Sequence, residues 1–277
     1  MDAIRECERR LRESGSTFAT AFMLLPRDER AALTAFYAYC REVDDAADEG
    51  GGGGPAIQEW RRRVADIYMG RPDDHPVAKA LRWATGRFPI ERSHLELVLD
   101  GVESDLDGQN IETFSDLYRY CYRVASSVGL VLVTVLGDPK GEARLYAELT
   151  GIAVQLTNII RDVAEDAAAG RVYLPMEDLA AFNLTRQDLR QMSKNLERLL
   201  AFEARRAHHL YDLGEAALPR SLRSRMYFAE ALRDTYRALL MRIEADGFPV
   251  FERRVRLSAG SKVALAIRRR ALSWLGW

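Results

Sequence analysis

Two pairs of aspartates, each set four residues apart within an apolar helical pattern, constrain this chain more than any other feature. The first pair lies in residues 36–49, which read FYAYCREVDDAADE and contain no Gly or Pro that would interrupt a helix. Asp44 and Asp48 therefore share one helix face, with Arg41 one turn earlier and Asp45 beside them. Unpaired buried charge is costly, so a packed helix does not normally carry two carboxylates along one stripe. A bound divalent cation would offset that cost.

The second pair repeats the pattern in residues 155–166, which read QLTNIIRDVAED. At steps of three, four and four, one helical stripe carries the oxygen-bearing side chains of Gln155, Asn158, Asp162 and Asp166. Two such helices facing each other across a cavity would form a site for several Mg²⁺ ions and a diphosphate. The pattern alone leaves a second interpretation open, in which these are two unrelated solvated surfaces.

Beyond this spacing, the amino-acid sequences of the two stretches resemble those of a known family. YAYCREVDDAADE and QLTNIIRDVAEDAAAGRVYLP resemble the two aspartate-rich motifs of the squalene/phytoene synthase family, and the resemblance extends over residues 18–262. That family consists of head-to-head prenyl transferases, and the chain is most similar to its bacterial presqualene diphosphate and squalene synthases. The resemblance implies an all-α fold, namely a single-domain isoprenoid synthase (class I terpenoid synthase) helical bundle around a central cavity, spanning residues 1–277.

The periodicity of apolar residues agrees with an all-helical chain, because strand patterns are almost absent. We predict helices over residues 4–13, 26–49, 56–69, 76–85, 91–107, 114–136, 143–166, 184–214 and 220–246. The glycine run at residues 50–54 is the clearest break, and we interpret it as a loop rather than a domain linker.

Composition excludes several classes of partner and location. A net charge of −1 and a pI of about 6.5 give no basic signature for nucleic acid. Three scattered cysteines predict a reducing compartment without disulfides. The N-terminal residues lack a signal-peptide core, and the most apolar run, residues 128–136, is too short to span a bilayer. We therefore expect a cytoplasmic protein or a peripheral one on the inner face of the membrane.

The C-terminal segment, residues 247–277, is basic and ends in several apolar residues. It could lie on an anionic membrane surface, which would suit an enzyme with greasy substrates and products. A last helix packed on the bundle, with solvated arginines, is the alternative. Within this segment, Arg253 or Arg254 could reach a substrate phosphate.

The resemblance implies a specific reaction. Two farnesyl diphosphates would condense head to head into presqualene diphosphate, squalene or both, supplying hopanoid and other isoprenoid pathways; phytoene synthesis from two geranylgeranyl diphosphates is the alternative. The cofactor would be Mg²⁺, with Mn²⁺ as a substitute, and NADPH would enter if the reaction continues to squalene. The implied metal-binding residues are Asp44, Asp45, Asp48, Asn158, Asp162 and Asp166.

The resemblance also implies roles for other side chains. Substrate binding would fall to Ser16, Thr17, Phe18, Phe22, Arg41, Gln155, Asn158 and Arg171. Catalytic roles would fall to Arg41, Tyr122, Arg171, Tyr173 and Tyr236. For Phe18, Phe22 and Tyr236, plain core packing explains the residues equally well, and Arg171 has a surface loop as its alternative.

The chain departs from the family pattern at three places. Gly15 replaces a serine that contacts diphosphate in many members, and Ser126 replaces a glycine. Arg123 stands where some squalene synthases have a catalytic tyrosine, which argues against a complete squalene synthase, although Tyr120 or Tyr122 could still reach the cavity.

Two rival functions remain at this stage. One is a class I terpene cyclase or a chain-elongating prenyl transferase, against which the Arg41 context and the RVYLP segment argue. The other is a non-catalytic isoprenoid-binding helical protein, against which the four intact motif aspartates argue. Chain length of the substrate and oligomeric state are not readable from the sequence.

Overall fold

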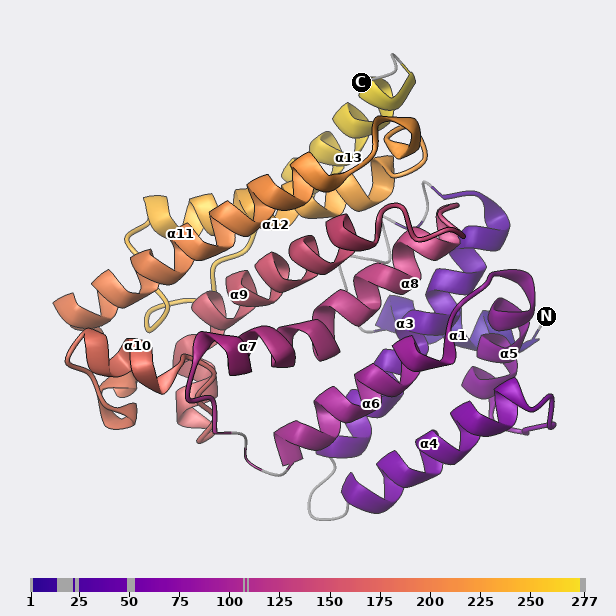
Figure 1. Ribbon diagram of the computed structural model, residues 1–277, viewed down its shortest axis with the longest axis horizontal. Helices are drawn as coiled ribbons and strands as arrows, with labels where there is room; N and C mark the ends of the chain where they lie inside the picture. Colours follow the sequence, from indigo (N-terminus) through magenta and orange to yellow (C-terminus); the bar gives the residue numbers. More distant parts are fainter. Residues whose placement is uncertain are drawn as a thin grey trace. The chain divides into compact units, whose positions relative to one another are not determined.

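The protein is described by a computed structural model that covers residues 2–13, 22, 25–48, 53–106, 108 and 110–274 (Figure 1); within its helices, the side chains of residues 47, 48, 259 and 272–274 lie outside the description. These described residues form α-helices with short π and 3-10 segments, and no strand occurs among them. The all-α prediction is therefore confirmed. None of the described helices has the length and apolar character needed to cross a membrane.

The chain divides into two compact units. Unit 1 comprises Met1–Asp107 and Leu130–Gly141, and unit 2 comprises Gly108–Gly129 and Glu142–Trp277. The helices of unit 1 are α1 (Asp2–Glu13), α3 (Arg27–Asp48), α4 (Gly53–Tyr68), α5 (Pro76–Arg87), α6 (Arg92–Leu106) and the part of α8 (Ser127–Val135) that follows Gly129. The chain therefore leaves unit 1 and returns to it before completing unit 2.

Unit 1 packs around the middle of α3. Tyr39 is fully buried there, and its hydroxyl donates a hydrogen bond to the carbonyl of Leu95 on α6 at 2.7 Å. Its ring also meets Trp60 of α4 edge-on, with the ring centroids 5.5 Å apart. A buried tyrosine needs a partner for its hydroxyl, so this bond fixes α3 against α6. The last turns of α3, which carry the first acidic motif, extend from this anchored segment.

The remaining helices belong to unit 2. They are α7 (Phe114–Cys121), the π segment η1 (Tyr122–Ser126), the start of α8, α9 (Arg144–Ala168), α10 (Met176–Ala181), η2 (Arg186–Arg190), α11 (Lys194–Ala217), η3 (Arg220–Leu222), α12 (Tyr227–Ala245) and α13 (Ala259–Trp274). Figure 1 shows α9, α11 and α12 lying along one another, with α13 on α12.

Helix α9 organises unit 2 because its two sides differ in polarity. Leu156, Ile160 and Val163 are buried in a core that also contains Leu199 and Tyr211 of α11. With 3.6 residues per turn, burial of this face turns the stripe of oxygen-bearing side chains to the other side of the helix. Packing therefore decides which way the second acidic motif points.

The predicted helix over residues 114–136 is helical from Phe114 to Val135 but contains a π segment. The chain continues from α7 to α8 through a π turn at Tyr122–Ser126, where the hydrogen bonds skip one additional residue. At this turn Ser126 lies against Gly151 of α9, where a Cβ on the glycine would stand 2.6 Å from the Ser126 Cα. The Ser126 hydroxyl donates to the carbonyl of Glu148 at 2.8 Å. The π turn thus lies at a close approach of the two backbones.

The prediction of one helix over residues 184–214 was wrong at its start. The segment opens with the 3-10 turn η2, and α11 begins only at Lys194. Ser193 is the N-cap of α11, and its hydroxyl accepts a hydrogen bond from the Leu196 amide at 3.1 Å. Serine favours a helix start over a helix interior, because its side chain satisfies an otherwise unpaired backbone amide. The short helix α10 was not predicted.

Candidate active site

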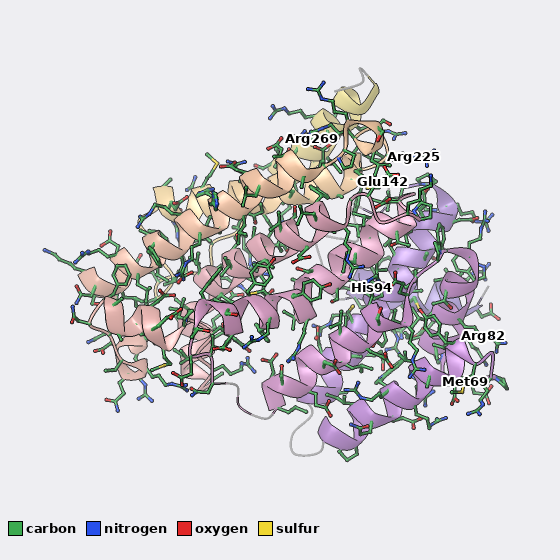
Figure 2. All side chains as sticks on the ribbon, viewed as in Figure 1. Met69, Arg82, His94, Glu142, Arg225 and Arg269 are labelled. Carbon is green, nitrogen blue, oxygen red and sulfur yellow. The ribbon has the colours of Figure 1, made fainter. Side chains whose placement is uncertain are left out.

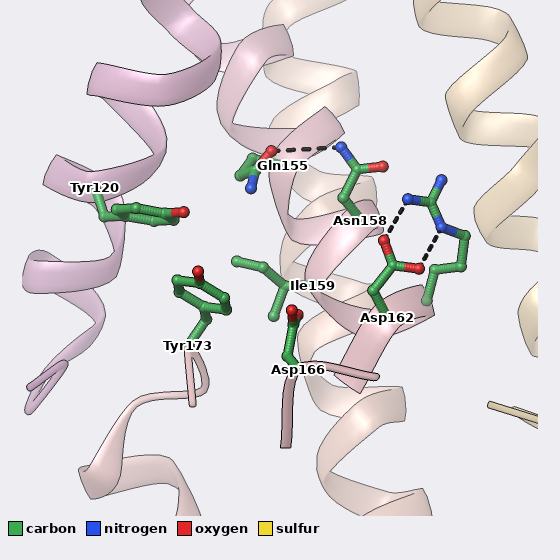
Figure 3. Close-up of a pocket in the computed structure, with 8 residues that line it drawn as sticks. Tyr120, Gln155, Asn158, Ile159, Asp162, Asp166 and Tyr173 are labelled. Carbon is green, nitrogen blue, oxygen red and sulfur yellow. Dashed lines mark hydrogen bonds and ion pairs between the residues drawn. The ribbon is translucent and has the colours of Figure 1, made fainter. Parts of the chain in front are cut away.

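The second acidic motif lines a cavity in unit 2. This cavity has a volume of about 220 Å³ and is lined by Tyr120, Gln155, Asn158, Ile159, Arg161, Asp162, Asp166 and Tyr173 (Figure 3). Six of these residues come from α9, whose oxygen-bearing stripe faces the space. The structure therefore brings the four predicted residues of this stripe together with Tyr173.

Asp162 is a cavity carboxylate that two arginines neutralise. Its side chain is only 16% exposed, and Arg161 forms a two-pronged ion pair with it, with the Nε of Arg161 2.7 Å from Oδ1. Arg254, 92 residues further along the chain, donates to Oδ2 at 2.8 Å. Burial opposes the charge of Arg161, but the ion pair with Asp162 outweighs it, so the pKa of Arg161 lies above its ordinary value.

Arg161 was not among the predicted site residues. It lies next to Asp162 in sequence, and adjacent helix positions normally point in different directions. A long guanidinium side chain can nevertheless bend around the helix to reach the neighbouring carboxylate, which spacing arguments do not capture. The arginine directly before the second aspartate pair was the available signal.

Asp166 and Arg171 close the end of the stripe. Helix α9 terminates beyond Asp166, and Gly170 adopts a left-handed conformation (φ 78°) that turns the chain back. The turn leaves the Nε of Arg171 3.9 Å from Oδ1 of Asp166. Arg171 is about half exposed, so its guanidinium remains accessible to an incoming anion.

Asn158 carries a buried oxygen without a hydrogen-bond partner among the described residues. Its amide nitrogen donates to Oε1 of Gln155 at 3.3 Å, whereas its Oδ1 has no such partner. An unsatisfied buried acceptor costs free energy of about 1–3 kcal/mol. Because this atom belongs to a residue lining the cavity, it is suited to accept from, or coordinate to, something that enters the cavity.

Tyrosines form the wall opposite α9. The rings of Tyr120 and Tyr173 stack with their centroids 5.0 Å apart and an interplanar angle of 19° (Figure 3). Tyr122 lies in the π turn instead, and its hydroxyl accepts a hydrogen bond from Arg144 at 3.4 Å. Of the two tyrosines considered from the sequence, Tyr120 is the one that lines the cavity. Tyr236 is partly buried on α12 and lies close enough to Arg161 to influence it electrostatically.

The first acidic motif is described within unit 1. Arg41 donates to Oδ1 of Asp45 at 2.5 Å, and its guanidinium lies 3.8 Å from Asp44. These three side chains are about half exposed, unlike Asp162. Asp48 belongs to the last turn of α3, and its side chain lies outside the described part of the chain. The ion pairs show that Arg41 already balances the aspartates of its own helix.

The predicted entrance residues are only partly described. Phe22 is buried, with 5% of its surface exposed. Ser16, Thr17 and Phe18 lie outside the described residues, so their predicted contacts with substrate stay predictions.

The oxygen donors on α9 fit a divalent metal that brings further ligands with it. Among the described side chains, no three carboxylates, histidines or cysteines converge into a ready-made metal site. Asp162, Asp166 and the unpartnered Oδ1 of Asn158 instead offer hard oxygen donors along one stripe. Mg²⁺ is typically held by one or two carboxylates, with waters and substrate phosphates completing its shell. The residues present therefore fit a metal that binds together with a phosphate-bearing substrate.

The fold defines the class of protein. A dehydrosqualene synthase crystallised with a ligand superposes with a TM-score of 0.87 at 29% sequence identity, covering 98% of this chain and 96% of that one. A squalene synthase from Alicyclobacillus acidocaldarius superposes with a TM-score of 0.81 at 27% identity, covering 89% of this chain and 95% of that one. The chain therefore has the all-α isoprenoid synthase fold.

The sequence gives the family. The squalene/phytoene synthase family model matches residues 11–261. A phytoene synthase from Arthrospira platensis is 33% identical over 288 residues, which cover 95% of this chain and 90% of that protein. The chain belongs to the squalene/phytoene synthase family and is an enzyme that transfers prenyl groups. Members of this family use a divalent metal to bind prenyl diphosphates.

Proposed function

We propose that this enzyme condenses two farnesyl diphosphates head to head into presqualene diphosphate, the cyclopropyl product that can continue to squalene. The observation that carries the proposal is the cavity on α9, where Asp162, Asp166 and the unpartnered oxygen of Asn158 lie beside Arg161. Carboxylates alone would repel a diphosphate. Arginines alone could bind a diphosphate, but they would leave the carboxylates of the cavity without a role. Their combination suits a diphosphate that arrives with metal ions.

Three arginines would bind the diphosphate. Arg161 and Arg254 already lie within ion-pair distance of Asp162, and Arg171 lies beside Asp166. Their guanidinium groups can donate two parallel hydrogen bonds to phosphate oxygens, which orients the group as well as neutralising it. Positive charge placed on the leaving diphosphate favours cleavage of the bond between C1 of the prenyl chain and oxygen, with the electron pair departing on oxygen.

The metal ligands in this proposal are the residues of the two acidic motifs. In unit 2, Asn158, Asp162 and Asp166 would be ligands of Mg²⁺. In unit 1, Asp44, Asp45 and Asp48 would have the same role, and Mn²⁺ would suit the same oxygen ligands. When bound, the metal supplies Lewis-acid neutralisation of the diphosphate charge. Arg41 adds positive charge beside the first motif, and Gln155 holds the Asn158 amide so that its oxygen stays available.

The aromatic wall would protect the reacting carbons. The rings of Tyr120 and Tyr173 stack on each other in the lining of the cavity, and the π-faces of aromatic rings attract cations. Such a wall excludes water from an allylic cation while the double bond of the second prenyl chain attacks it. Loss of a proton then closes the cyclopropane ring, and the released diphosphate is a base that could take that proton. Tyr122 and Tyr236 stay proposed catalytic residues, with Tyr236 placed near Arg161.

Phytoene synthesis from two geranylgeranyl diphosphates is the second candidate. It is favoured by sequence, because relatives such as the Arthrospira platensis enzyme are phytoene synthases. The farnesyl substrate is supported by the solved structures, which are a dehydrosqualene synthase and a squalene synthase. The two candidates use the same diphosphate chemistry and differ in the length of chain that the enzyme accepts.

Product analysis separates the candidates. The purified protein would be incubated with Mg²⁺ and either farnesyl or geranylgeranyl diphosphate, with and without NADPH, and the products identified by mass spectrometry. We expect presqualene diphosphate from farnesyl diphosphate, and squalene only if NADPH is used. Phytoene from the longer substrate would instead establish the second candidate. If neither substrate is consumed, the proposed function is wrong.

Asp162→Asn tests the site itself. The substitution keeps the size of the side chain but removes its charge, and we expect turnover to fall by about a hundredfold or more. Asp212→Asn is the matched control, because Asp212 is also paired with an arginine (Arg237, 2.7 Å) but lies on α11 away from the cavity lining. Both variants should keep the helical circular dichroism spectrum. Equal activity in the two variants would refute the assignment of Asp162.

A further inference from the structure

Helix α12 ends in a tight turn. Asp246 is its C-cap residue, and the amide of Phe248 donates to the carbonyl of Ile243 at 2.9 Å, which closes the turn. Gly247 and Phe248 both have left-handed backbones, with φ angles of 73° and 55°. This conformation is costly for a phenylalanine, but the side chain of Phe248 is only 5% exposed, so its burial in the core offsets the cost. The chain therefore leaves α12 with a defined geometry.

The carboxylate of Asp246 lies at an electrostatically unfavourable end of its helix. The C-terminal end of a helix carries a partial negative charge, which opposes an acidic side chain there. Two arginines compensate, because the Nε of Arg242 lies 2.9 Å and the Nη2 of Arg253 lies 2.7 Å from Oδ2 of Asp246. The side chain of Asp246 is 15% exposed. One of the two stabilising arginines thus belongs to the segment beyond the turn.

The next residue of that segment contacts the candidate active site. Arg254 donates from Nη2 to Oδ2 of Asp162 at 2.8 Å, and its Nη1 lies 3.4 Å from Glu165. Residues 253–258 have no regular secondary structure, so no helical hydrogen bonds fix this arginine. Val255 is buried in the core of unit 2 and holds the segment on one side. The neighbouring arginines therefore join two helices, Arg253 binding the end of α12 and Arg254 binding α9.

Helix α13 holds the far end of the segment. Arg269 of this helix (labelled in Figure 2) has its Nε 2.5 Å from Asp234 and its Nη1 3.4 Å from Glu230, both on α12. This contact lies 15 residues beyond Arg254 in the chain, whereas the ion pair of Asp246 is made by the residue directly before Arg254. Asp246 is therefore the charged contact placed to control where Arg254 lies.

An arginine binds an anion more tightly when its position is fixed beforehand. A residue in an irregular segment loses conformational freedom when a ligand orders it, and this loss opposes binding. Ion pairs between fully exposed side chains order a segment weakly. The carboxylate of Asp246 is largely buried and receives two guanidinium groups, which makes it a stronger point of attachment.

We propose that Asp246 is a positioning residue, which holds Arg253 and thereby keeps Arg254 against the carboxylate stripe of α9. The inference deepens the proposed function and rests on it, because the role of Arg254 there is to bind the diphosphate. Asp246 itself would touch neither substrate nor metal and would act only through the two arginines.

Binding of inorganic diphosphate tests the proposal without any prenyl substrate. Affinity would be measured by titration calorimetry in the presence of Mg²⁺. We expect Asp246→Asn to weaken binding about fivefold, because the charge that holds Arg253 is lost, and Arg253→Gln to weaken it to the same extent. Asp246→Glu keeps the charge and should restore affinity to within about twofold of the original protein.

Arg242→Gln is the matched control. It removes the other arginine of Asp246 but leaves the ion pair with Arg253 in place, so it should bind diphosphate like the original protein. Circular dichroism would verify that each variant is folded at the temperature of the titration. A loss of affinity in Arg242→Gln as large as that in Asp246→Asn would contradict the proposal, because the effect would then belong to the helix end in general.

A double-mutant cycle shows whether Asp246 acts through Arg254. Arg254→Gln removes the guanidinium and should weaken diphosphate binding about tenfold, and adding Asp246→Asn should weaken it no further. Full affinity in Asp246→Asn, or an equal loss in both backgrounds, would overturn the positioning role and leave the proposed function intact. Failure of the original protein to bind diphosphate with Mg²⁺ would overturn both.

Discussion

The hydroxyl of a buried tyrosine stabilises a helical core only where it finds a hydrogen-bond partner. Helix α11 contains a buried tyrosine whose hydroxyl has a hydrogen-bond partner, and helix α9 contains one whose hydroxyl has none among the described residues. Tyr211 has its hydroxyl 3.0 Å from that of Thr157, which in turn donates to the carbonyl of Ala153. Tyr146 is equally buried, but its hydroxyl has no hydrogen-bond partner among the described residues. The same deletion should therefore have opposite consequences at these two positions.

We expect Tyr211→Phe to lower the free energy of unfolding by about 1 kcal/mol, because it removes a satisfied buried hydrogen bond. Tyr146→Phe should leave that free energy unchanged or raise it by up to about 1 kcal/mol, since it removes a desolvated group without a partner. Urea denaturation of both variants measures the difference. A larger loss in Tyr146→Phe than in Tyr211→Phe would contradict the assignment of partners.

Glu203 links stability to pH. It has no exposed surface, and burial raises its pKa to about 8 even though Arg206 lies beside it. Between pH 4.5 and 8 the folded protein keeps a proton that the unfolded chain releases, so the unfolding free energy contributed by this group falls as the pH rises through that window. Below that window both states are protonated and the contribution no longer changes with pH.

Glu203→Gln should remove this dependence. The amide has the same shape and stays neutral, so the variant should lose less stability than the original protein between pH 5 and 8 and exceed it in stability above pH 8. Urea midpoints measured across this range check the expectation. Parallel pH profiles for the two proteins would show that Glu203 is not the group responsible.

At the scale of elements, close backbone approach accounts for the π segment between α7 and α8. Helical periodicity predicted one helix there, because it reads only which residues are apolar. The π turn depends on contact with α9, where the absent side chain of Gly151 leaves room for Ser126. The two residues in this contact are 25 positions apart, so a local sequence pattern cannot predict it. The N-cap at Ser193, in contrast, is a local signal, because a serine that precedes a helical apolar pattern is visible in the sequence.

Gly151→Ala should be strongly destabilising. The new Cβ would stand 2.6 Å from the Cα of Ser126, and backbone cannot move aside cheaply, so we expect a loss of about 1–3 kcal/mol in the free energy of unfolding. Gly86→Ala on α5 is the matched control, because nothing lies within 4 Å of its Cβ position. That control should raise stability by about 0.5–1 kcal/mol through helix propensity. Equal effects from the two substitutions would refute the close approach.

At the scale of the whole molecule, one helix that belongs to both units bears on whether the protein unfolds as one domain or as two. Helix α8 begins in unit 2 with Ser127 and continues into unit 1 from Leu130, so one helix belongs to both units. Val131 and Val135 of this helix are buried. A helix shared in this way couples the folding of its two ends, and we propose that residues 1–277 unfold as the single domain predicted from the sequence.

Coincident transitions would test this single domain. In a background with Trp274→Phe and Trp277→Phe, the remaining tryptophans, Trp60 and Trp83, both lie in unit 1. Gly151→Ala alters unit 2, yet it should lower the midpoint of the tryptophan fluorescence transition as much as that of circular dichroism. A fluorescence midpoint that stays in place while the circular dichroism midpoint falls would show two independent domains.

The sequence by itself determined the helical class, the two acidic stripes and the family resemblance, because a 3.6-residue period and a contiguous motif are local properties. Only the tertiary structure decided which other residues contact those stripes. It brought Arg254 to Asp162 across 92 residues and stacked Tyr120 on Tyr173. It also paired Arg269 of α13 with Asp234 and Glu230 of α12, 35 and 39 residues earlier in the chain. Local periodicity fixes which residues share a face, but the partner of that face is chosen by long-range packing and charge.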